Sequence, residues 1–277
     1  MTQSKKNLIA KIIRTVVVLA LALLCAFPLY YIIVSSFKDP IDMTKNPFSL
    51  PNPWVGGNYV EAFADGTIIR AFVNTVIVTV AAVFLQVFFG SMAAYGIIQK
   101  KSRFTAAVGS VLMIAFAVPA QATLLPLFKM ESSWGLVDSL LGLILLYLGS
   151  TVFCYFLIVG YMKSLPQELF EAARIDGAGP FTIYFKIVLP LIKPILITVV
   201  VFQVMGTWND FLYPSVFLSS QDNQTVVLQV FNAVQQFSTN WPLFMAITVI
   251  ALFPVFIFFV FCQKWIVSGL VAGSVKG

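Results

Sequence analysis

A short polar stretch, residues 171–179, combines charged residues, alanines and glycines, and it lies between two hydrophobic spans. Charged groups, small helix formers and helix-breaking glycines follow one another there: Glu171, Ala172, Ala173, Arg174, Asp176, Gly177 and Gly179. Charged side chains at the rim of a contact form charge-assisted hydrogen bonds, and alanines let a helix approach another surface closely. The pattern indicates binding to a partner protein. The alternative is an ordinary amphipathic loop in which the alanines are accidental.

Two short helices are expected to position these residues within the loop 163–190. Ser164 and Pro166 are favoured near the start of a helix, which Gly177 then ends. The apolar surface of this first helix is expected to consist of Leu169, Phe170, Ala173 and Ile175. Its polar rim is expected to carry Glu168, Glu171, Arg174 and Asp176. A second helix, 180–188, is expected to begin at a proline and to lead to Leu189 and Pro190. The loop is thereby expected to transmit a displacement to the next span.

Catalytic chemistry has little support in this sequence. There is no histidine, the commonest general base and metal ligand, and no G-x-x-x-x-G-K-[ST] phosphate-binding motif. Cys25, Cys154 and Cys262 stand alone, without C-x-x-C spacing. Asp210 is the single acidic residue placed near membrane depth, at the outer end of a span. We therefore predict no catalytic site, no metal site and no cofactor bound by this chain.

The composition requires a lipid environment. Hydrophobic residues make up 60% of the chain and charged residues 10%, against roughly 45–50% and about 25% in soluble domains. Lipid cannot satisfy free backbone N–H and C=O groups, so the membrane-crossing elements are expected to be helices. The sequence thus predicts an all-α, polytopic integral membrane protein.

Six spans are predicted, mainly from runs that lack charge. About 20 apolar residues cross a bilayer as a helix, and four charge-free runs are longer than that. The fifth run, 194–209, is shorter, and the span is long enough only if Lys193 extends toward one interface. The predicted spans are 15–37, 71–96, 104–128, 139–162, 189–212 and 243–263, within one domain over 1–277.

Basic residues set the orientation of these spans. With the N-terminus inside, thirteen of the 17 basic residues lie in cytoplasmic segments, and only Lys38, Lys45, Arg70 and Lys129 lie outside. This asymmetry follows the positive-inside rule. Both termini and the loop 163–190 are therefore expected in the cytoplasm. The net charge of +6 reflects this topology, and a nucleic-acid partner is not expected.

Small residues and prolines indicate how the helices pack and bend. Gly90 and Ala94 have the small-xxx-small spacing that permits close helix approach in lipid. Prolines interrupt the first, third and sixth spans, which are expected to be kinked or locally unwound. These prolines are Pro28, Pro119, Pro126 and Pro254.

Uncharged polar residues at membrane depth are candidates for a translocation pathway, because such groups are costly in lipid unless they are paired or face a cavity. They are Gln86, Gln121, Thr123, Gln203, Thr207 and Asn209. Sugar hydroxyls suit such groups. The alternative is that they form hydrogen bonds between neighbouring helices.

The polar stretch resembles the EAA coupling loop in permease subunits of ATP-driven (ABC) importers, where E-A-A, a following glycine and a later I-x-L-P recur together. The resemblance to the maltose-type, carbohydrate-uptake subgroup of type I importers extends over nearly the whole chain. It includes the segments 74–75, 90–95, 118–119, 126–127, 135–143 and 208–211, and the ending Gly-Leu-Val-Ala-Gly-Ser-Val-Lys-Gly at 269–277. It implies the type I permease fold in a bacterial or archaeal cytoplasmic membrane.

The resemblance also implies partners. A second homologous permease, usually a different chain, completes the pathway; two ATP-binding subunits hold ATP and Mg²⁺ and contact the loop 167–179; and an extracytoplasmic solute-binding protein delivers the substrate. Within that family the substrate is expected to be an oligosaccharide. The alternatives are a permease for another solute such as a polyol or glycerol phosphate, a secondary transporter, or a membrane scaffold.

Overall fold

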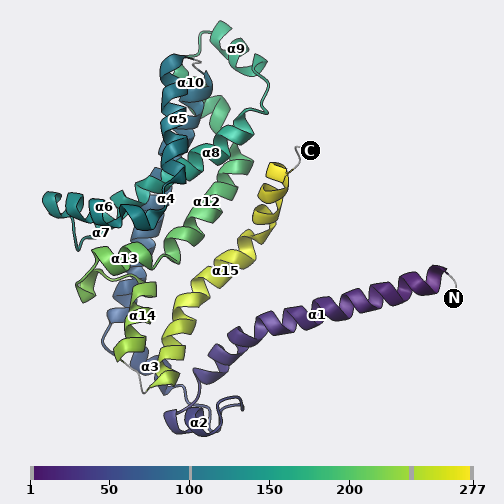
Figure 1. Ribbon diagram of the computed structural model, residues 1–277, viewed down its shortest axis with the longest axis vertical. Coiled ribbons are helices and arrows are strands. Elements are labelled where there is room, and N and C mark those ends of the chain that lie inside the picture. Colours follow the sequence, from purple (N-terminus) through teal and green to yellow (C-terminus); the bar gives the residue numbers. More distant parts are fainter. Residues whose placement is uncertain (1–2, 100–101, 237–239, 275–277) are drawn as a thin grey trace. The chain divides into compact units, whose positions relative to one another are not determined.

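The computed structural model describes residues 3–99, 102–236 and 240–274 (Figure 1). Within those ranges every regular element is a helix and none is a strand, which confirms the all-α prediction. The chain groups into two compact units, and each is described by itself. The first comprises Met1–Ile68 and Val230–Phe253, and the second Ile69–Gln229 and Pro254–Gly277. A single domain over 1–277 stays a prediction.

The first unit contains a long helix followed by a folded loop. Its helices are α1 (Gln3–Ser35), α2 (Pro40–Lys45) and α3 (Gly57–Ala64). The loop is held by Asn58, whose buried amide nitrogen donates to the carbonyl oxygens of Ser36 at 2.8 Å and of Lys38 at 2.9 Å. The Ser36 hydroxyl also lies 2.6 Å from the hydroxyl of Tyr59. The proline-rich segment after the first span is therefore structured.

The second unit contains the elements that form the candidate site. They are α4 (Thr67–Gln99, from Ile69), α5 (Arg103–Ala117), α6 (Ala120–Trp134), α7 (Leu140–Tyr147), α8 (Thr151–Met162), α9 (Glu168–Ile175), α10 (Pro180–Ile183), a π-helical turn (Tyr184–Val188), α11 (Leu189–Leu191), α12 (Lys193–Trp208) and α13 (Leu212–Phe217). Short 3₁₀ turns lie at Leu148–Ser150 and Gln221–Asn223. Helices α14 (Val226–Gln236) and α15 (Trp241–Ser274) contribute residues to both units.

Four helices in the described ranges are long and apolar enough to cross a membrane, namely Ile9–Ser35, Thr67–Gln99, Leu140–Met162 and Trp241–Trp265. Two further helix pairs meet the same criterion only if each bent pair forms one span. The structure therefore gives four to six membrane helices, and the exact six predicted spans stay a prediction.

The third predicted span is not one continuous helix. Helix α5 ends at Ala117, α6 begins at Ala120, and the two helices meet at 104°. Val118 is extended because the ring of Pro119 disfavours helical geometry in the preceding residue. The sequence predicts an interruption at this proline. Helix α6 continues to Trp134, and the predicted end of the span at 128 stays a prediction.

The fifth predicted span is also broken. The segment Pro180–Leu191 meets α12 at 78°, with Ile192 between them. Pro190 and Pro194 have no N–H to donate, so the helical hydrogen-bond ladder is interrupted on both sides of Ile192. Helix α12 ends at Trp208 rather than at the expected residue 212. The span predicted over 189–212 therefore contains a turn at Ile192 and a helix that ends at Trp208.

Helix α4 packs closely against α8 within the second unit. A Cβ atom added to Gly90 would lie 2.6 Å from the Cβ of Cys154, so only glycine fits there without movement. One turn further on, Ala94 is fully buried in a hydrophobic cluster with Tyr155 and Ile158. The small-xxx-small pair predicted from the sequence thus lies at a helix contact, as expected for packing in lipid.

Candidate functional site

The loop between α8 and α12 is anchored by one face of α9. Phe170 and Ala173, three residues apart, are buried in the hydrophobic cluster of the second unit, with exposed fractions of 1% and 7%. Glu168 and Glu171 lie in the first turn of α9 and Arg174 in the last, which suits the helix dipole. Helix α9 is therefore packed against the hydrophobic cluster of the second unit through one face.

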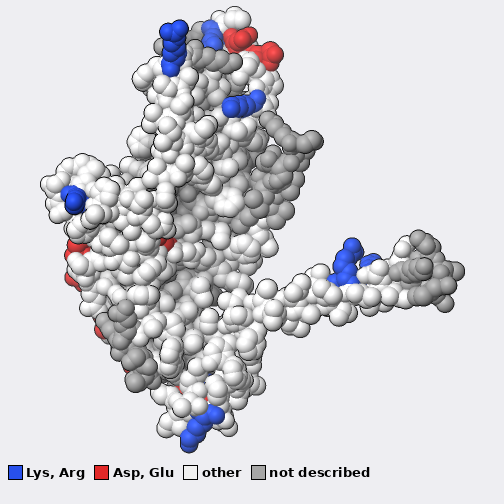
Figure 2. Space-filling model, in the orientation of Figure 1, with Lys and Arg blue, Asp and Glu red and all other residues white. Residues whose placement is uncertain are grey.

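The other face of α9 is exposed and mixed in character. Its exposed residues include Glu168, Glu171, Ala172, Arg174 and Asp176. Figure 2 shows acidic and basic side chains together around α9, while most of the neighbouring surface is uncharged. Ile175 is 86% exposed and Leu169 42% exposed. An exposed surface with both charges and large apolar groups suits a protein partner.

One expectation for this helix is wrong. Leu169, Phe170, Ala173 and Ile175 do not form a single apolar surface, because Phe170 and Ala173 point into the protein core while Leu169 and Ile175 are exposed. Successive residues of an α-helix are rotated by about 100°, so Ile175 lies on a different side from Phe170. The exposed apolar groups of α9 are thus Leu169 and Ile175.

Glycine and proline residues shape the rest of the loop. Gly177 ends α9 with φ +80°, a conformation that favours glycine, and Ala178 N donates to Ala173 O at 2.9 Å. Gly179 precedes α10 in an extended conformation. The π-helical turn Tyr184–Val188 comes just before Pro190, which cannot donate to the carbonyl four residues earlier. The predicted second helix, 180–188, is therefore present in a modified form that continues to Leu191.

Three side chains of α4 connect to this loop. The hydroxyls of Ser91 and Tyr184 lie 2.7 Å apart, and the hydroxyl of Tyr95 donates to Pro180 O at 3.1 Å. Arg174 donates from its guanidinium to the side-chain oxygen of Gln99. These contacts join both short helices of the loop to one membrane helix.

Sequence reasoning missed the role of these α4 residues, although a signal was present. Ser91, Tyr95 and Gln99 recur at intervals of four, which places them on one helix face at the end of an otherwise apolar helix. A polar stripe of that kind, near a polar loop, indicates a contact between the two.

Two of the six candidate pathway residues form hydrogen bonds between helices. The Gln86 amide nitrogen donates to Tyr147 O at 2.8 Å, and that of Gln203 donates to Ser150 O at 3.1 Å. Tyr147 directly precedes the 3₁₀ turn Leu148–Ser150, and Ser150 is its last residue, where the α-helical pattern between α7 and α8 is interrupted. The geometry of these two residues thus favours the interhelical alternative.

The other four candidates differ in burial and in their hydrogen bonds. Thr207 is buried, whereas Asn209 is exposed and its amide donates back to Met205 O at 2.8 Å. Gln121 is exposed on α6, and the half-buried Thr123 donates to Ala120 O at 2.7 Å. A role of these four residues in a pathway stays a prediction.

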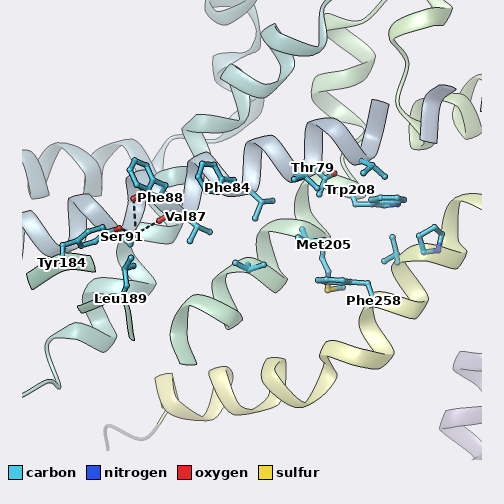
Figure 3. Close-up of a pocket in the computed structure, with 17 residues that line it drawn as sticks. Thr79, Phe84, Val87, Phe88, Ser91, Tyr184, Leu189, Met205, Trp208 and Phe258 are labelled. Atoms are coloured by element: carbon cyan, nitrogen blue, oxygen red, sulfur yellow. Dashed lines mark hydrogen bonds between the residues drawn. The ribbon is translucent and has the colours of Figure 1, made fainter. Parts of the chain in front are cut away.

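A separate apolar pocket of about 610 Å³ lies within the second unit, between α4, α12 and the part of α15 near Phe258. None of the six candidate pathway residues lines it. Thr79 and Trp208 lie toward one end of this pocket, and Ser91 and Tyr184 lie at the other end (Figure 3).

Comparison with a family model decides the class of the protein. Residues 86–271, about two thirds of the chain, match the model described as "Binding-protein-dependent transport system inner membrane component". The chain belongs to this family. It is a permease subunit of an ABC importer, a multi-pass protein of the cytoplasmic membrane and a transport subunit rather than an enzyme. The family resemblance noted in the sequence is confirmed.

Individual relatives match the permease along its length. It is 34% identical to the "Probable starch degradation products transport system permease protein AmyC" of Thermoanaerobacterium thermosulfurigenes, over 98% of this chain and 99% of that protein. It is 31% identical to the arabinooligosaccharides permease AraQ of Bacillus subtilis, over 96% of each chain. It is 32% identical to the melibiose/raffinose/stachyose permease MelC of the same organism, over 96% of this chain and 98% of MelC.

Solved structures agree on the fold. A chain of a bacterial ABC transporter involved in the import of the acidic polysaccharide alginate superposes with a TM-score of 0.82 at 24% identity, covering 95% of the permease and 98% of that chain. A chain of the alginate transporter in complex with its pentasaccharide-bound periplasmic protein gives a TM-score of 0.71 at 14% identity, covering 94% of each chain. The type I permease fold expected from the sequence is thereby confirmed.

Proposed function

We propose that this permease forms half of the translocation pathway of an ATP-driven importer for uncharged oligosaccharides. The observation that carries the proposal is the loop 167–179, which has an exposed mixed surface on one side and is bound to the protein core and to α4 on the other. The names of the relatives AmyC, AraQ and MelC support a carbohydrate substrate.

The partners follow from this assignment. A second, homologous permease, most naturally a different chain, completes the pathway; two ATP-binding subunits hold ATP and Mg²⁺ and contact the exposed face of α9; and an extracytoplasmic binding protein delivers the substrate. In support, one matching structure is a chain of a complex with a substrate-bound periplasmic protein.

The coupling residues then have distinct roles. Glu168, Glu171, Ala172, Arg174 and Asp176, with Leu169 and Ile175, contact the ATPase. Phe170 and Ala173 carry its movement into the hydrophobic cluster, because close-packed interiors transmit displacement. Gly177, Gly179 and Pro190 set the path of the chain between the two short helices and α12. Movement of α9 reaches α4 through Tyr95, Tyr184 and Gln99.

The substrate is uncharged in this proposal, because the candidate pathway residues are neutral. Thr207, Asn209, Gln121 and Thr123 remain candidates for contact with sugar hydroxyls. Gln86 and Gln203 already donate to helix carbonyls, so we assign them mainly to helix packing. Replacing Thr207 by Val and Asn209 by Leu in the assembled importer is expected to raise the KM for uptake several-fold, and an unchanged KM would remove both from the pathway.

The experiment that tests the function measures uptake and ATP hydrolysis in proteoliposomes containing the whole importer with its binding protein. The variants Glu171→Lys and Gly177→Trp are expected to lower uptake at least tenfold while the permeases still assemble in the membrane. Glu61→Lys, an exposed charge reversal on the first unit, is the matched control and is expected to leave uptake unchanged. Uptake at the unmodified rate with both loop variants contradicts the coupling role.

A further inference from the structure

The break between α7 and α8 is a 3₁₀ turn, Leu148–Ser150, in the middle of the fourth predicted span. In a regular α-helix the carbonyl oxygen of Tyr147 accepts a hydrogen bond from the N–H of Thr151. Here Thr151 N donates to Leu148 O instead, and Tyr147 O accepts from the amide nitrogen of Gln86 on α4 at 2.8 Å. A side chain of another helix thus supplies a hydrogen bond that an α-helix would make with its own backbone.

The backbone of this turn is close to α-helical geometry. The ψ angles of Tyr147, Leu148 and Ser150 are −14°, −22° and −5°, against about −42° in an α-helix. Gly149 is exposed, and a Cβ added to it would meet nothing within 4 Å. A modest rotation of a few ψ angles therefore converts the turn into a continuous α-helix, and one side of the turn has room for the movement.

Two buried polar atoms beside the turn are unsatisfied. The side-chain oxygen of Gln86 and the hydroxyl of Thr151 have no hydrogen-bond partner among the described residues. One is an acceptor and the other can donate. Both lie at the contact of α4 with α8, because a Cβ added to Gly90, one turn after Gln86, would lie 3.2 Å from Thr151 O. Unpaired buried polar groups are costly, so a small rearrangement that pairs these two atoms is favourable.

Helix α12 bonds to the same turn from another side. The amide nitrogen of Gln203 donates to Ser150 O at 3.1 Å. The hydroxyl of Tyr147 donates to the carboxylate of Asp210, just beyond the end of α12, at 2.7 Å. Helix α12 follows directly on the loop 163–190, and α4 is hydrogen-bonded to that loop. A displacement of the loop therefore moves the helices that hold the turn on both sides.

We propose that Leu148–Ser150 is a hinge that straightens during the transport cycle, with Gln86 holding the bent form and Thr151 the straight form. In the straight form Thr151 N donates to Tyr147 O as the Gln86 amide nitrogen leaves, and the Thr151 hydroxyl donates to the Gln86 side-chain oxygen. One hydrogen bond at Tyr147 O is exchanged for another, so the position of α4 and α12 decides between the two forms. This role rests on the transport function proposed above.

Spin labels on the two sides of the turn test the hinge in the whole importer. Leu141 on α7 and Gly160 on α8 are exposed, and each is replaced by a spin-labelled non-natural amino acid, so that the native cysteines stay in place. Pulsed electron paramagnetic resonance measures the distance between the labels in proteoliposomes, without nucleotide and with a non-hydrolysable ATP analogue. We expect the analogue to change the distance by about 2 Å or more, because the rise of three residues falls by about 1.5 Å and the bend is removed.

A second pair of labels, at Val111 and Gly160, is the matched control. Val111 is exposed on α5, which packs on α8 through the rings of Phe116 and Phe156. Neither α5 nor the α8 label is separated from the other by the turn, so this distance is expected to stay constant with and without the analogue.

Two variants are expected to shift the hinge in opposite directions. Gln86→Met removes the amide at similar size, and it should raise the population with the nucleotide-bound distance at least threefold in the absence of nucleotide. Thr151→Val removes only an unpaired hydroxyl of the bent form, and it should lower that population at least threefold with the analogue bound. Thr15→Val on α1, where the hydroxyl donates to Lys11 O, is the control and should change neither population.

Several results would overturn the hinge. They are an unchanged distance between positions 141 and 160 in an unmodified importer that takes up oligosaccharide, a Gln86→Met importer that keeps the nucleotide-free distance, and shifts of both variants in the same direction. If Gln86→Met does not assemble, Thr151→Val decides, since the bent form does not use its hydroxyl. Absence of oligosaccharide uptake by the unmodified importer contradicts the proposed function instead, because the distance between the labels is measured independently of uptake.

Discussion

Tyr184 joins the loop 163–190, the proposed coupling loop, to α4 through one hydroxyl–hydroxyl hydrogen bond with Ser91. Ser91 keeps two other acceptors, the carbonyl oxygens of Val87 and Phe88, so loss of the tyrosine hydroxyl leaves no unpaired group on α4. Removal of this bond is thus a clean test of the connection between the loop and the helix.

We expect Tyr184→Phe to uncouple transport with little loss of stability. A neutral hydrogen bond contributes about 0.5–1.5 kcal/mol, and the ring still fills its place in the hydrophobic cluster. Substrate uptake per ATP hydrolysed should fall several-fold in proteoliposomes. Tyr161→Phe, a partly buried tyrosine in the same cluster, is the control. Equal coupling ratios in the two variants argue against transmission through Tyr184.

Gly177 and Gly179 allow a comparison of the backbone strain that a single added methyl group causes. Gly177 has φ +80°, whereas Gly179 has φ −72°, and a Cβ would meet nothing within 4 Å at either position. Gly177→Ala is therefore expected to cost about 1–2 kcal/mol through backbone strain alone, and Gly179→Ala close to nothing. Thermal unfolding of the purified complex and uptake both measure the difference. A lower Tm for Gly179→Ala than for Gly177→Ala contradicts this account.

For single residues, the sequence predicted the exposed charges of the loop and its break at Gly177, because these depend on local residue types. That the loop binds a partner stays a prediction. The sequence did not predict the contacts of Tyr184 with Ser91 or of Gln203 with Ser150, which join residues 93 and 53 positions apart. The choice between a pathway role and helix packing for Gln203 depends on which carbonyl lies opposite it. That is a property of tertiary structure.

Among the elements, helix α4 forms side-chain hydrogen bonds to loops of the second unit near both of its ends. Toward its C-terminus it holds the coupling loop through Ser91 and Tyr95. Toward its N-terminus Asn74 donates to the carbonyl oxygen of Asp222 at 2.8 Å, and Thr75 accepts from Val226 N at 2.9 Å. One helix thus connects the two loops that lie before and after α12, and a displacement of α4 affects both.

The contact of α4 with α8 yields a prediction with an internal control. An added methyl group at Gly90 would lie 2.6 Å from Cys154 Cβ, whereas one at Gly96 would meet nothing within 4 Å. Gly90→Ala is expected to cost roughly 1–3 kcal/mol by overpacking. Gly96→Ala is expected to be neutral or stabilising by up to about 1 kcal/mol. Detergent stability of the purified permease measures both, and equal stability of the two variants contradicts the packing role of Gly90.

Asp138, between α6 and α7, organises the loop after α13. Its carboxylate accepts from the backbone nitrogens of Ser219 and Ser220, each at 3.0 Å. Burial raises the pKa of Asp138, but hydrogen bonds from Ser220, Ser219 and Asn223 outweigh it and hold the pKa below the ordinary 3.8. The stability that these bonds contribute is therefore complete above the ordinary value, and it is lost as the pH falls through the lowered pKa of the folded protein.

We expect Asp138→Asn to loosen this loop at neutral pH by about 1 kcal/mol, because a neutral amide is a weaker acceptor than a carboxylate. Hydrogen exchange at the amides of Ser219 and Ser220 measures the effect. The unmodified protein should match the variant only at a pH below 3.8, after correction for intrinsic exchange. Equal protection of the two proteins at neutral pH contradicts this role for Asp138.

The two helix breaks show which features of the helices can be predicted from the sequence and which cannot. The interruption at Pro119 was predicted from the sequence, whereas the break next to Pro194 was not. Pro28, Pro126 and Pro254, at which interruptions were also expected, lie inside helices α1, α6 and α15. The angles of 104° and 78° at the two breaks cannot be predicted from the sequence. They depend on which neighbouring helices pack against each half.

For the whole molecule, the basic residues predict a topology in which the loop 163–190 is cytoplasmic and the segment after α12 is external. The fifth predicted span has two possible arrangements, because the bent pair Pro180–Leu191 and α12 suits either a broken span or a re-entrant loop. The coupling role of α9 requires the loop to face the ATP-binding subunits. Labelling of the segments before and after α12 therefore shows whether α12 crosses the membrane.

Cysteine labelling in intact cells distinguishes the two arrangements. Gly56→Cys and Ser219→Cys are expected to react with a membrane-impermeant maleimide from outside, and Gly179→Cys only after permeabilisation. All three positions are exposed, and Gly56 and Gly179 leave room for a side chain. The native Cys25, Cys154 and Cys262 lie in predicted spans, and the unmodified protein measures their background. If position 219 reacts only after permeabilisation, residues 180–208 enter and leave the membrane on the same side. Helix α12 then does not cross the bilayer, and the six-span arrangement on which the pathway assignment depends is wrong.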